Sequence, residues 1–414
     1  MNQDLITIGK KAQNAANKLA LMDTATKNKA LIQLADDLIK NKDTVIDANQ
    51  QDLANATTMP AKFTDRLMVN AQRIEDMANG LRSIADLNDP TAQIDKGWIT
   101  KDGLQILQRR VPLGVIGIIF EARPNVTVDA TGLTFKSGNA VILRGGKEAL
   151  QTNTALVKIL RESLQKQELP VNAVQLITDT SHAVADEMMK LTDYIDVLIP
   201  RGGRNLIQRV VTTATVPVIE TGAGNCHIYI DKDADLTMAT DITVNAKVQR
   251  PSVCNAAEKL LIHRDVAAKF LPTIAQALID HGVQLRGDTD ARKLVPAIRP
   301  ATDEDWATEY NDLIMTVKIV DSLDDAINHI NHYSTHHSEA IITNDITRGR
   351  YFQQAINSAC VYVNASTRFT DGGEFGFGAE IGISTQKLHA RGPMGLQQLT
   401  TIKYEITGNG QVRK

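Results

Sequence analysis

Cys254 has the surroundings that point most directly to chemistry. Lys247 and Arg250 lie close to it in the sequence, and nearby positive charge lowers the pKa of a thiol and favours the nucleophilic thiolate. Cys226 and Cys360 lie instead within apolar runs, where a buried thiol with a purely structural role is expected. The local sequence leaves two interpretations of Cys254 open, a nucleophile or a structural thiol.

A carboxylate and a glycine-rich turn form a second candidate feature. Glu220 follows the apolar run 216–219 and lies 254 minus 220, or 34, positions before Cys254. Gly222 and Gly224 come next, and glycines let the main chain approach a ligand closely. An ordinary turn at the end of a strand is the alternative. The segment after Gly224 is an apolar run rather than a helix, so the dinucleotide-binding fingerprint is not met.

Four histidines have the spacing of metal ligands on one helix face: His329, His332, His336 and His337. No cluster of cysteines or carboxylates completes a ligand set beside them. We therefore expect these histidines to be solvated or structural, and we expect no metal site.

The elements that must position these residues alternate in type along the chain. Residues 5–88 repeat apolar side chains at helical spacing, and the Asp102-Gly103 turn within 89–110 predicts a β-hairpin. Short apolar runs and amphipathic helices then alternate in two series, which predicts an α/β protein with two doubly wound domains and a small β-arm. The strands are expected at 115–120, 140–143, 174–177, 197–199 and 216–219, and then at 259–263, 317–320, 340–343 and 361–364.

Charge and cysteine content narrow the class of protein. The 414 residues include 45 Lys+Arg against 48 Asp+Glu, a formal charge of -3, which argues against a nucleic-acid or membrane-surface binder. Three cysteines are too few for a disulfide framework and are typical of a reducing compartment. The sequence shows no signal peptide and no spanning apolar run, so we expect a cytoplasmic protein that contacts neither nucleic acid nor membrane.

Longer motifs join these features. The Glu-x-Gly-x-Gly of Glu220, followed 34 positions later by Cys254, resembles the aldehyde dehydrogenase superfamily. Residues 111–125 are similar to that superfamily's first cofactor strand and the loop with its oxyanion-hole asparagine, which falls on Asn125, and residues 137–147 are similar to its next strand. Segments 120–125, 199–204, 224–227 and 371–384 closely resemble one branch, which reduces the acyl phosphate L-glutamate 5-phosphate in proline biosynthesis.

The resemblance implies a covalent mechanism. The Cys254 thiolate would attack the acyl carbon, the Asn125 amide would hold the oxyanion, and phosphate would leave to give a thioester. Hydride from NADPH would then yield L-glutamate 5-semialdehyde. Glu220 is expected in the active site without an assigned role as a base. The NADPH-binding domain would comprise 1–88 and 111–231, the catalytic domain 232–394, and an oligomerisation arm 89–110 and 395–414.

Both ligands of that branch are anionic, so cations are expected at the site. Arginine is preferred for bidentate contacts with carboxylates and phosphates, although a solvated or structural cation is the alternative at each position. The substrate-binding candidates are Arg250, Lys247, Arg123 and Arg391. The cofactor-binding candidates are Arg144, Lys147, Arg201, Gly202, Gly203 and Glu309.

Two other functions stay open at this point: a phosphate-independent aldehyde dehydrogenase, and a non-catalytic nucleotide-binding protein of the same fold. The expected partners are a second copy of the chain, through the β-arm, and glutamate 5-kinase, the enzyme that makes the acyl phosphate.

Overall fold

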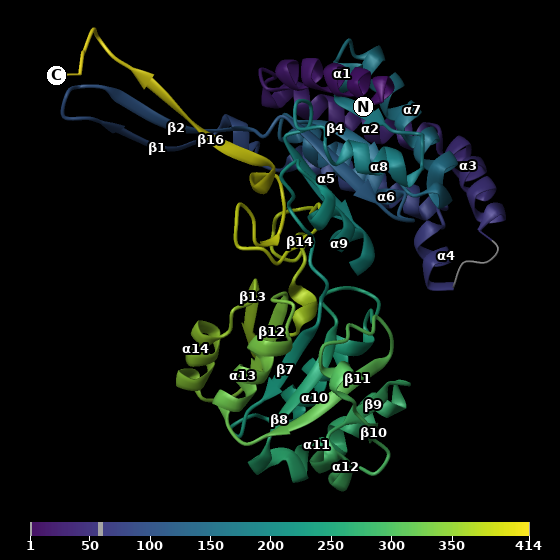
Figure 1. Ribbon diagram of the computed structural model, residues 1–414, viewed down its shortest axis with the longest axis vertical. Helices are drawn as coiled ribbons and strands as arrows, with labels where there is room; N and C mark the ends of the chain where they lie inside the picture. The colour runs from purple at the N-terminus through teal and green to yellow at the C-terminus, as the bar shows by residue number, and fades with distance from the viewer. Residues whose placement is uncertain (1, 57–60, 414) are drawn as a thin grey trace. The chain divides into compact units, whose positions relative to one another are not determined.

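The computed structural model describes residues 2–56 and 61–413, which form two compact units (Figure 1). Unit 1 contains Met1–Thr221, Gly376–Gly382 and Met394–Lys414, and unit 2 contains Gly222–Phe375 and Ile383–Pro393. Each unit is built on its own parallel sheet, as the alternation of strand-like and helical segments predicts.

The sheet of unit 1 has four parallel strands in the order β5-β4-β3-β6. Every residue of β3 and β4 is buried, which explains why these strands are continuous apolar runs rather than alternating ones. The bounds are β3 Val115–Phe120, β4 Ala140–Arg144, β5 Val174–Leu176 and β6 Val197–Arg201. The expected strand at 216–219 is only an isolated bridge from Val218 to Leu198, so that prediction was too long.

Nine helices accompany this sheet in the described part of unit 1, and α1, α6 and α7 contact its strands directly. Side chains of Asn2, Asp23 and Asn70 cap the N-termini of α1, α2 and α5. The helices are α1 Gln3–Leu19, α2 Thr24–Lys40, α3 Lys42–Asn55, α4 Ala61–Leu67, α5 Ala71–Asp86, α6 Asn125–Lys136, α7 Leu150–Lys166, α8 His182–Met188 and α9 Arg204–Thr213.

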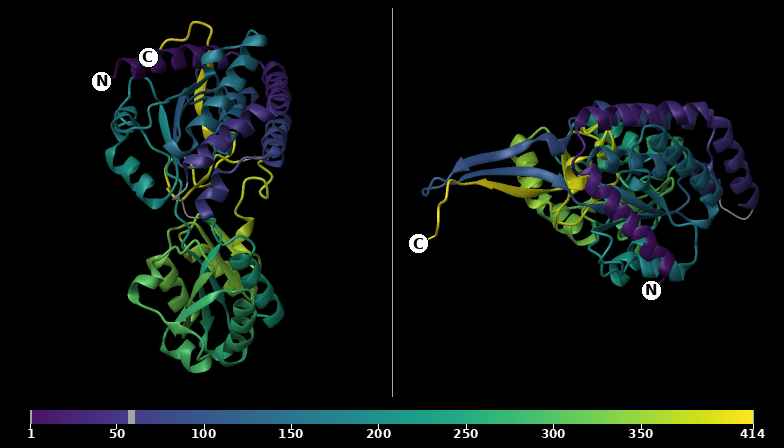
Figure 2. Two further views of the ribbon diagram at one scale, coloured as in Figure 1. Left: turned by 90° about the vertical axis from the view of Figure 1, so that its right-hand side faces the viewer. Right: turned by 90° about the horizontal axis from the view of Figure 1, so that it is seen from above.

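A three-stranded antiparallel arm projects from unit 1, as two views show (Figure 1, Figure 2). Strands β1 (Ile94–Ile99), β2 (Gln105–Pro112) and β16 (Thr400–Thr407) lie in the order β1-β2-β16. Gly103 closes the β1–β2 turn with a φ of 80°, a conformation that favours glycine. The predicted hairpin is therefore confirmed, and the C-terminal strand pairs with it in the same chain.

The sheet of unit 2 has seven parallel strands in the order β10-β9-β11-β8-β7-β12-β13. Their bounds are β7 Cys226–Ile230, β8 Ala257–His263, β9 Gln284–Gly287, β10 Arg299–Pro300, β11 Ile314–Val320, β12 Ser338–Ile342 and β13 Cys360–Val363, and a separate pair joins β14 Ile383–Ser384 to β15 Gly392–Pro393. The expected domain boundary at 231 left residues 226–230 in the first domain, whereas β7 pairs with β8 and β12 in unit 2.

Apolar side chains of this sheet point to both faces. Ile228 and Leu260 belong to one buried cluster, while their neighbours Tyr229 and Leu261 belong to another. This arrangement is the doubly wound α/β fold that the sequence predicts. The helices of unit 2 are α10 Leu236–Val248, α11 Arg264–Asp280, α12 Thr289–Leu294, α13 Leu323–Tyr333 and α14 Ile346–Ala355. No helix in the described parts of either unit has the length and apolar character needed to cross a membrane.

Candidate active site

Cys254 lies on a turn between α10 and β8. The N–H of Ala256 donates to the carbonyl of Val253 at 3.1 Å, so Cys254 and Asn255 are the two central residues of this turn. The Cys254 side chain is partly exposed, whereas Cys226 and Cys360 are buried. A partly exposed thiol on a short turn can reach a substrate carbonyl.

Asn255 ties this turn to residues 366–370. Its amide donates to the carbonyl oxygens of Arg368 at 3.3 Å and of Thr370 at 2.8 Å. The hydroxyl of Thr367 donates to the Asn255 carbonyl at 2.7 Å, and the Arg368 guanidinium donates to the Asn255 side-chain oxygen. Side-chain and main-chain atoms of the residue next to Cys254 are therefore both held in place.

Gly224 supports the turn from another direction. An ideal Cβ atom on Gly224 would lie 1.4 Å from the carbonyl oxygen of Cys254, so no larger residue fits without moving the turn. The N–H of Gly224 donates to the carboxylate of Glu309 at 2.7 Å. Glu309, expected at the cofactor, thus also holds the main chain that presses against the Cys254 carbonyl.

Two arginines provide positive charge near the thiol. Burial lowers the pKa of Arg368, the charge of Arg250 lowers it further, and the negative charge of a Cys254 thiolate would raise it. These electrostatic effects indicate that the Arg368 guanidinium lies near both Arg250 and Cys254. Arg250 was expected from the sequence. Arg368 was missed, because it is distant in sequence from Cys254 and only the fold brings it near.

Lys247 does not lie at the surface, and its expected role in substrate binding is not supported. Its ammonium group is fully buried and lies 3.0 Å from the carboxylate of Glu258, on the adjacent strand β8. The sequence shows that Lys247 carries a positive charge. It does not show that this charge is paired with Glu258 inside unit 2.

Arg391 and Arg123 have different surroundings. Arg391 donates to the main-chain and side-chain oxygens of Asn357 at 2.9 and 3.1 Å, which fixes its side chain in unit 2. Arg123 lies in unit 1, in the loop between β3 and α6, and its carbonyl accepts from the N–H of Val126. Both stay candidates for binding the anionic substrate.

Asn125 is the first residue of α6, and its side chain is exposed. Its amide donates to the carboxylate of Asp129, one helical turn later, at 2.9 Å. Burial raises the pKa of Asp129 to about 6, although the hydrogen bond from Asn125 and the charge of Arg201 oppose this effect. Asp129 was not singled out from the sequence, although its i,i+4 spacing from Asn125 could have indicated the contact.

The cofactor candidates of unit 1 lie at or just after the carboxyl ends of β4 and β6, where parallel sheets bind their ligands. Lys147 is exposed, and Arg201 ends β6. Arg144 is buried, and its guanidinium donates to the carbonyls of Thr180 and Ser181, so it holds main chain in addition to any ligand.

The main chain at Gly202 and Gly203 packs closely against the Glu121 carboxylate. An ideal Cβ on Gly202 would lie 2.6 Å from the Glu121 carboxylate, and the N–H of Gly203 donates to it at 2.8 Å. Gly203 directly precedes α9, where no side chain caps the helix. A helix N-terminus without a side-chain cap suits an anionic cofactor such as NADPH.

Glu220 lies one residue before Thr221, where the first segment of unit 1 ends. Its side chain is partly exposed. The next residue, Thr221, donates its hydroxyl to the carbonyl of Pro200 at 2.8 Å. This bond ties the segment after Val218 to strand β6.

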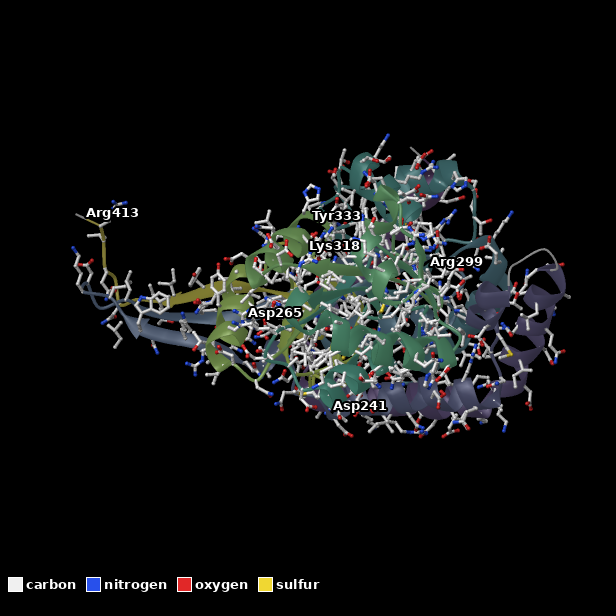
Figure 3. All side chains as sticks on the ribbon, turned by 90° about the horizontal axis from the view of Figure 1, so that it is seen from below. Asp241, Asp265, Arg299, Lys318, Tyr333 and Arg413 are labelled. Atoms are coloured by element: carbon white, nitrogen blue, oxygen red, sulfur yellow. The ribbon has the colours of Figure 1, made fainter. Side chains whose placement is uncertain are left out.

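The four histidines are not arranged around a common point. His329 packs edge-on against Trp306 and tilted against Tyr333, with Lys318 over the Trp306 ring; Lys318 and Tyr333 are labelled in Figure 3. His332 is exposed, and His337 is fully buried. Across residues 2–56 and 61–413, no group of three or more His, Cys, Asp or Glu side chains is placed to hold a metal ion.

Comparisons with known proteins identify the family of the chain. The aldehyde dehydrogenase family model matches residues 2–304. The chain is 90% identical to gamma-glutamyl phosphate reductase of Limosilactobacillus reuteri over 100% of both chains, and 54% identical to that of Caldanaerobacter subterraneus over 98% of both. The crystal structure of gamma-glutamyl phosphate reductase from Thermotoga maritima matches with a TM-score of 0.97 and 47% identity over 100% of both chains.

A more distant structure shares the fold alone. The acetylating aldehyde dehydrogenase from Geobacillus thermoglucosidasius has a TM-score of 0.72 at 15% identity, with 100% of this chain covered.

The family expected from the motifs around Cys254 and Glu220 is confirmed. The chain belongs to the aldehyde dehydrogenase family and, within it, to the gamma-glutamyl phosphate reductases.

Proposed function

We propose that the chain reduces L-glutamate 5-phosphate with NADPH to L-glutamate 5-semialdehyde and phosphate, the second step of proline biosynthesis. The observation that carries this proposal is a partly exposed Cys254 thiol on a turn anchored through Asn255, with Arg368 nearby and Arg250 four positions earlier in the chain. The names of relatives with up to 90% identity point to the same acyl phosphate.

Cys254 would act as the nucleophile. Its thiolate attacks the acyl carbon, a C–S bond forms, and the C–O bond to phosphate breaks to leave a thioester. The Asn125 amide and the Cys254 N–H are the proposed donors to the oxyanion. NADPH, when bound, supplies the hydride that reduces the thioester carbon. Cysteine suits this sequence because a thioester accepts hydride readily and the thiolate then leaves as the aldehyde forms.

The cations have separate tasks in this proposal. Arg250, Arg368, Arg123 and Arg391 are assigned to the phosphate and the α-carboxylate of the substrate, and Lys147, Arg201 and the Gly202-Gly203 turn to the phosphates of NADPH. A cation near the adenosine ribose favours NADPH over NADH, because NADPH carries a 2′-phosphate there. Glu309 remains a proposed cofactor-binding residue. Its carboxylate also accepts the hydrogen bond from the Gly224 N–H.

Glu220 has no proposed role as a base. A carboxylate that activated water would hydrolyse the thioester and release glutamate instead of the aldehyde. We place Glu220 in the active site only on the strength of its position in the family motif.

The arm is the proposed surface for a second copy of the chain. Its apolar side chains Trp98, Ile99, Ile402, Tyr404 and Ile406 are 42 to 73% exposed, and both β1 and β16 are edge strands of the sheet. An exposed apolar strand edge invites pairing with another chain. We also propose that the enzyme works in the cytoplasm and contacts glutamate 5-kinase, which would shield the labile acyl phosphate from water.

The experiment that tests this function runs the reaction in reverse. Purified protein is mixed with glutamate 5-semialdehyde and NADP, and NADPH is followed by its absorbance with and without phosphate. We expect steady turnover only with phosphate or arsenate, and none for Cys254→Ala. Cys360→Ala, which alters a buried thiol of the same unit, is the matched control and should keep its activity. Turnover without phosphate would instead indicate a hydrolytic aldehyde dehydrogenase.

A further inference from the structure

A second thiol lies directly behind the turn that carries Cys254. Cys226 is the first residue of β7 and is fully buried. Its sulfur lies 3.2 Å from the carbonyl oxygen of Cys254, within hydrogen-bond distance for a thiol donor. The mechanism proposed above makes no use of this group.

Cys226 is a thiol rather than a thiolate. Burial raises its pKa well above the ordinary value, and the nearby charge of Glu339 raises it further. Its sulfur also lies 3.8 Å from Nδ1 of His337, but burial lowers the pKa of that histidine to about 4, so the ring is neutral. The single S–H hydrogen therefore has its closer acceptor in the Cys254 carbonyl.

The same carbonyl is restrained by the residue two positions before Cys226. Gly224 lies so close to it that an ideal Cβ would overlap the oxygen, and Glu309 holds the N–H of Gly224 at 2.7 Å. The segment 224–226 thus contacts the Cys254 carbonyl twice, once through the Cys226 hydrogen bond and once through the close approach of Gly224.

We propose that Cys226 is a positioning residue, which donates its S–H to the carbonyl of Cys254 and so fixes the direction of the Cys254 side chain. With Asn255 anchored on residues 366–370, the turn is held at two consecutive residues. A small displacement of a reacting group lowers the rate of the chemical step. We therefore expect the contact to affect kcat rather than KM. The kinetic part of this inference rests on the proposed function, because it assigns Cys254 as the nucleophile.

The test compares three variants with the full-length wild type. Cys226→Ala removes the donor, Cys226→Val removes it while filling the space, and Cys226→Ser keeps an O–H donor. Loss of one ordinary hydrogen bond corresponds to about a three- to tenfold fall in kcat. We expect that fall for Ala and Val with KM unchanged, and kcat within about twofold of wild type for Ser. Cys360→Ala, another buried thiol of unit 2, should leave kcat unchanged.

A second readout needs no substrate. The rate at which iodoacetamide alkylates Cys254, measured on its peptide by mass spectrometry, is followed against pH. In the Ala and Val variants the midpoint should move up, because a less restrained thiolate spends less time near Arg250 and Arg368; in the Ser variant it should not. Circular dichroism checks folding, and if Ala does not fold, Ser against Val decides.

The outcomes separate the two proposals. If wild type lacks reductase activity, the proposed function fails, while the alkylation midpoints still test positioning. If wild type is active and the Ala and Val variants match it in both kcat and midpoint, the positioning role of Cys226 is overturned. A Ser variant as impaired as Val would overturn it too, since the donor would then not matter.

Discussion

Gly224 shows at the scale of one residue how little room the nucleophile turn has. An added Cβ would meet the Cys254 carbonyl at 1.4 Å, so the turn or the start of β7 must move. Displacements of about 1 Å cost on the order of a hundredfold in rate.

For Gly224→Ala we therefore predict a fall in kcat of on the order of a hundredfold. Cys360→Ala, which alters a buried residue of the same unit, is the control. Steady-state kinetics with circular dichroism on both variants gives the answer. A folded Gly224→Ala enzyme with wild-type kcat would show that the close approach has no bearing on catalysis.

Asp129 gives a prediction that depends on pH. Its pKa in the folded protein is raised to about 6 by burial, above the value of 3.8 expected when unfolded. Between these values the folded protein holds a proton that the unfolded chain has lost, so this group lowers stability as pH rises through about 6. Above about pH 6, Asn125 donates its hydrogen bond to a charged, partly buried Asp129 carboxylate.

Asp129→Asn removes this titration. Relative to wild type, the free energy of unfolding of the variant should therefore increase between about pH 5 and about pH 7.5. Urea denaturation at both pH values measures the difference. An equal difference at the two pH values would mean that Asp129 has no raised pKa.

The sequence served well for residues whose neighbours in the chain define them. Cys254 and Asn125 lie in long motifs, which single them out as candidate site residues. Arg368 and the Cys226 contact could not be predicted, because each depends on which distant segment the fold places alongside. Asp129 was missed although it lies only one helical turn after Asn125. Motifs show what chemistry a residue can do, but only the fold shows its partners.

Helix α10 and strand β8 are joined by a buried ion pair, which was not visible in the sequence. Lys247 and Glu258 lie 3.0 Å apart with almost no exposure. Burial raises the pKa of Glu258 to about 7, while the charges of Lys247 and Lys259 oppose this. The pair therefore depends on Lys247 to keep the carboxylate compensated.

Lys247→Met should destabilise the protein by about 3 to 5 kcal/mol, because it leaves Glu258 buried and unpaired. The double variant Lys247→Met/Glu258→Met should recover much of this loss. Denaturant unfolding measures both, and KM for the semialdehyde should stay near wild type. A raised KM for Lys247→Met with unchanged stability would show that Lys247 binds the substrate.

Strands were predicted from the same kind of reasoning, with unequal success. Continuous apolar runs identified the fully buried strands β3 and β4. The run at 216–219 is also apolar but contains Pro217, and it bridges β6 only through Val218. An apolar run shows that a segment is buried, whereas its pairing depends on the topology.

The arm links the single chain to a larger assembly in our proposal. Tyr404 and Ile406 on edge strand β16 are 51% and 59% exposed. Charged residues on an edge strand oppose pairing with another chain. The double variant Tyr404→Lys/Ile406→Lys should therefore have a lower molar mass by light scattering than wild type.

Ile346→Lys is the control for the arm, because Ile346 is 67% exposed at the start of α14, far from the arm in sequence. Its molar mass should equal that of wild type. If the arm variant also keeps the wild-type mass, the arm does not carry the contact between copies.

The thioester on Cys254 is the central claim, and a single measurement addresses it. Enzyme at a concentration comparable to its substrates is mixed with glutamate 5-semialdehyde and NADP without phosphate, and NADPH is recorded by stopped flow. We expect a burst of about one NADPH per Cys254, then a stop until phosphate is added, since phosphate releases the acyl group. No burst is expected from Cys254→Ala. Continuous turnover without phosphate, or a burst from Cys254→Ala, would show that no stable thioester forms on Cys254.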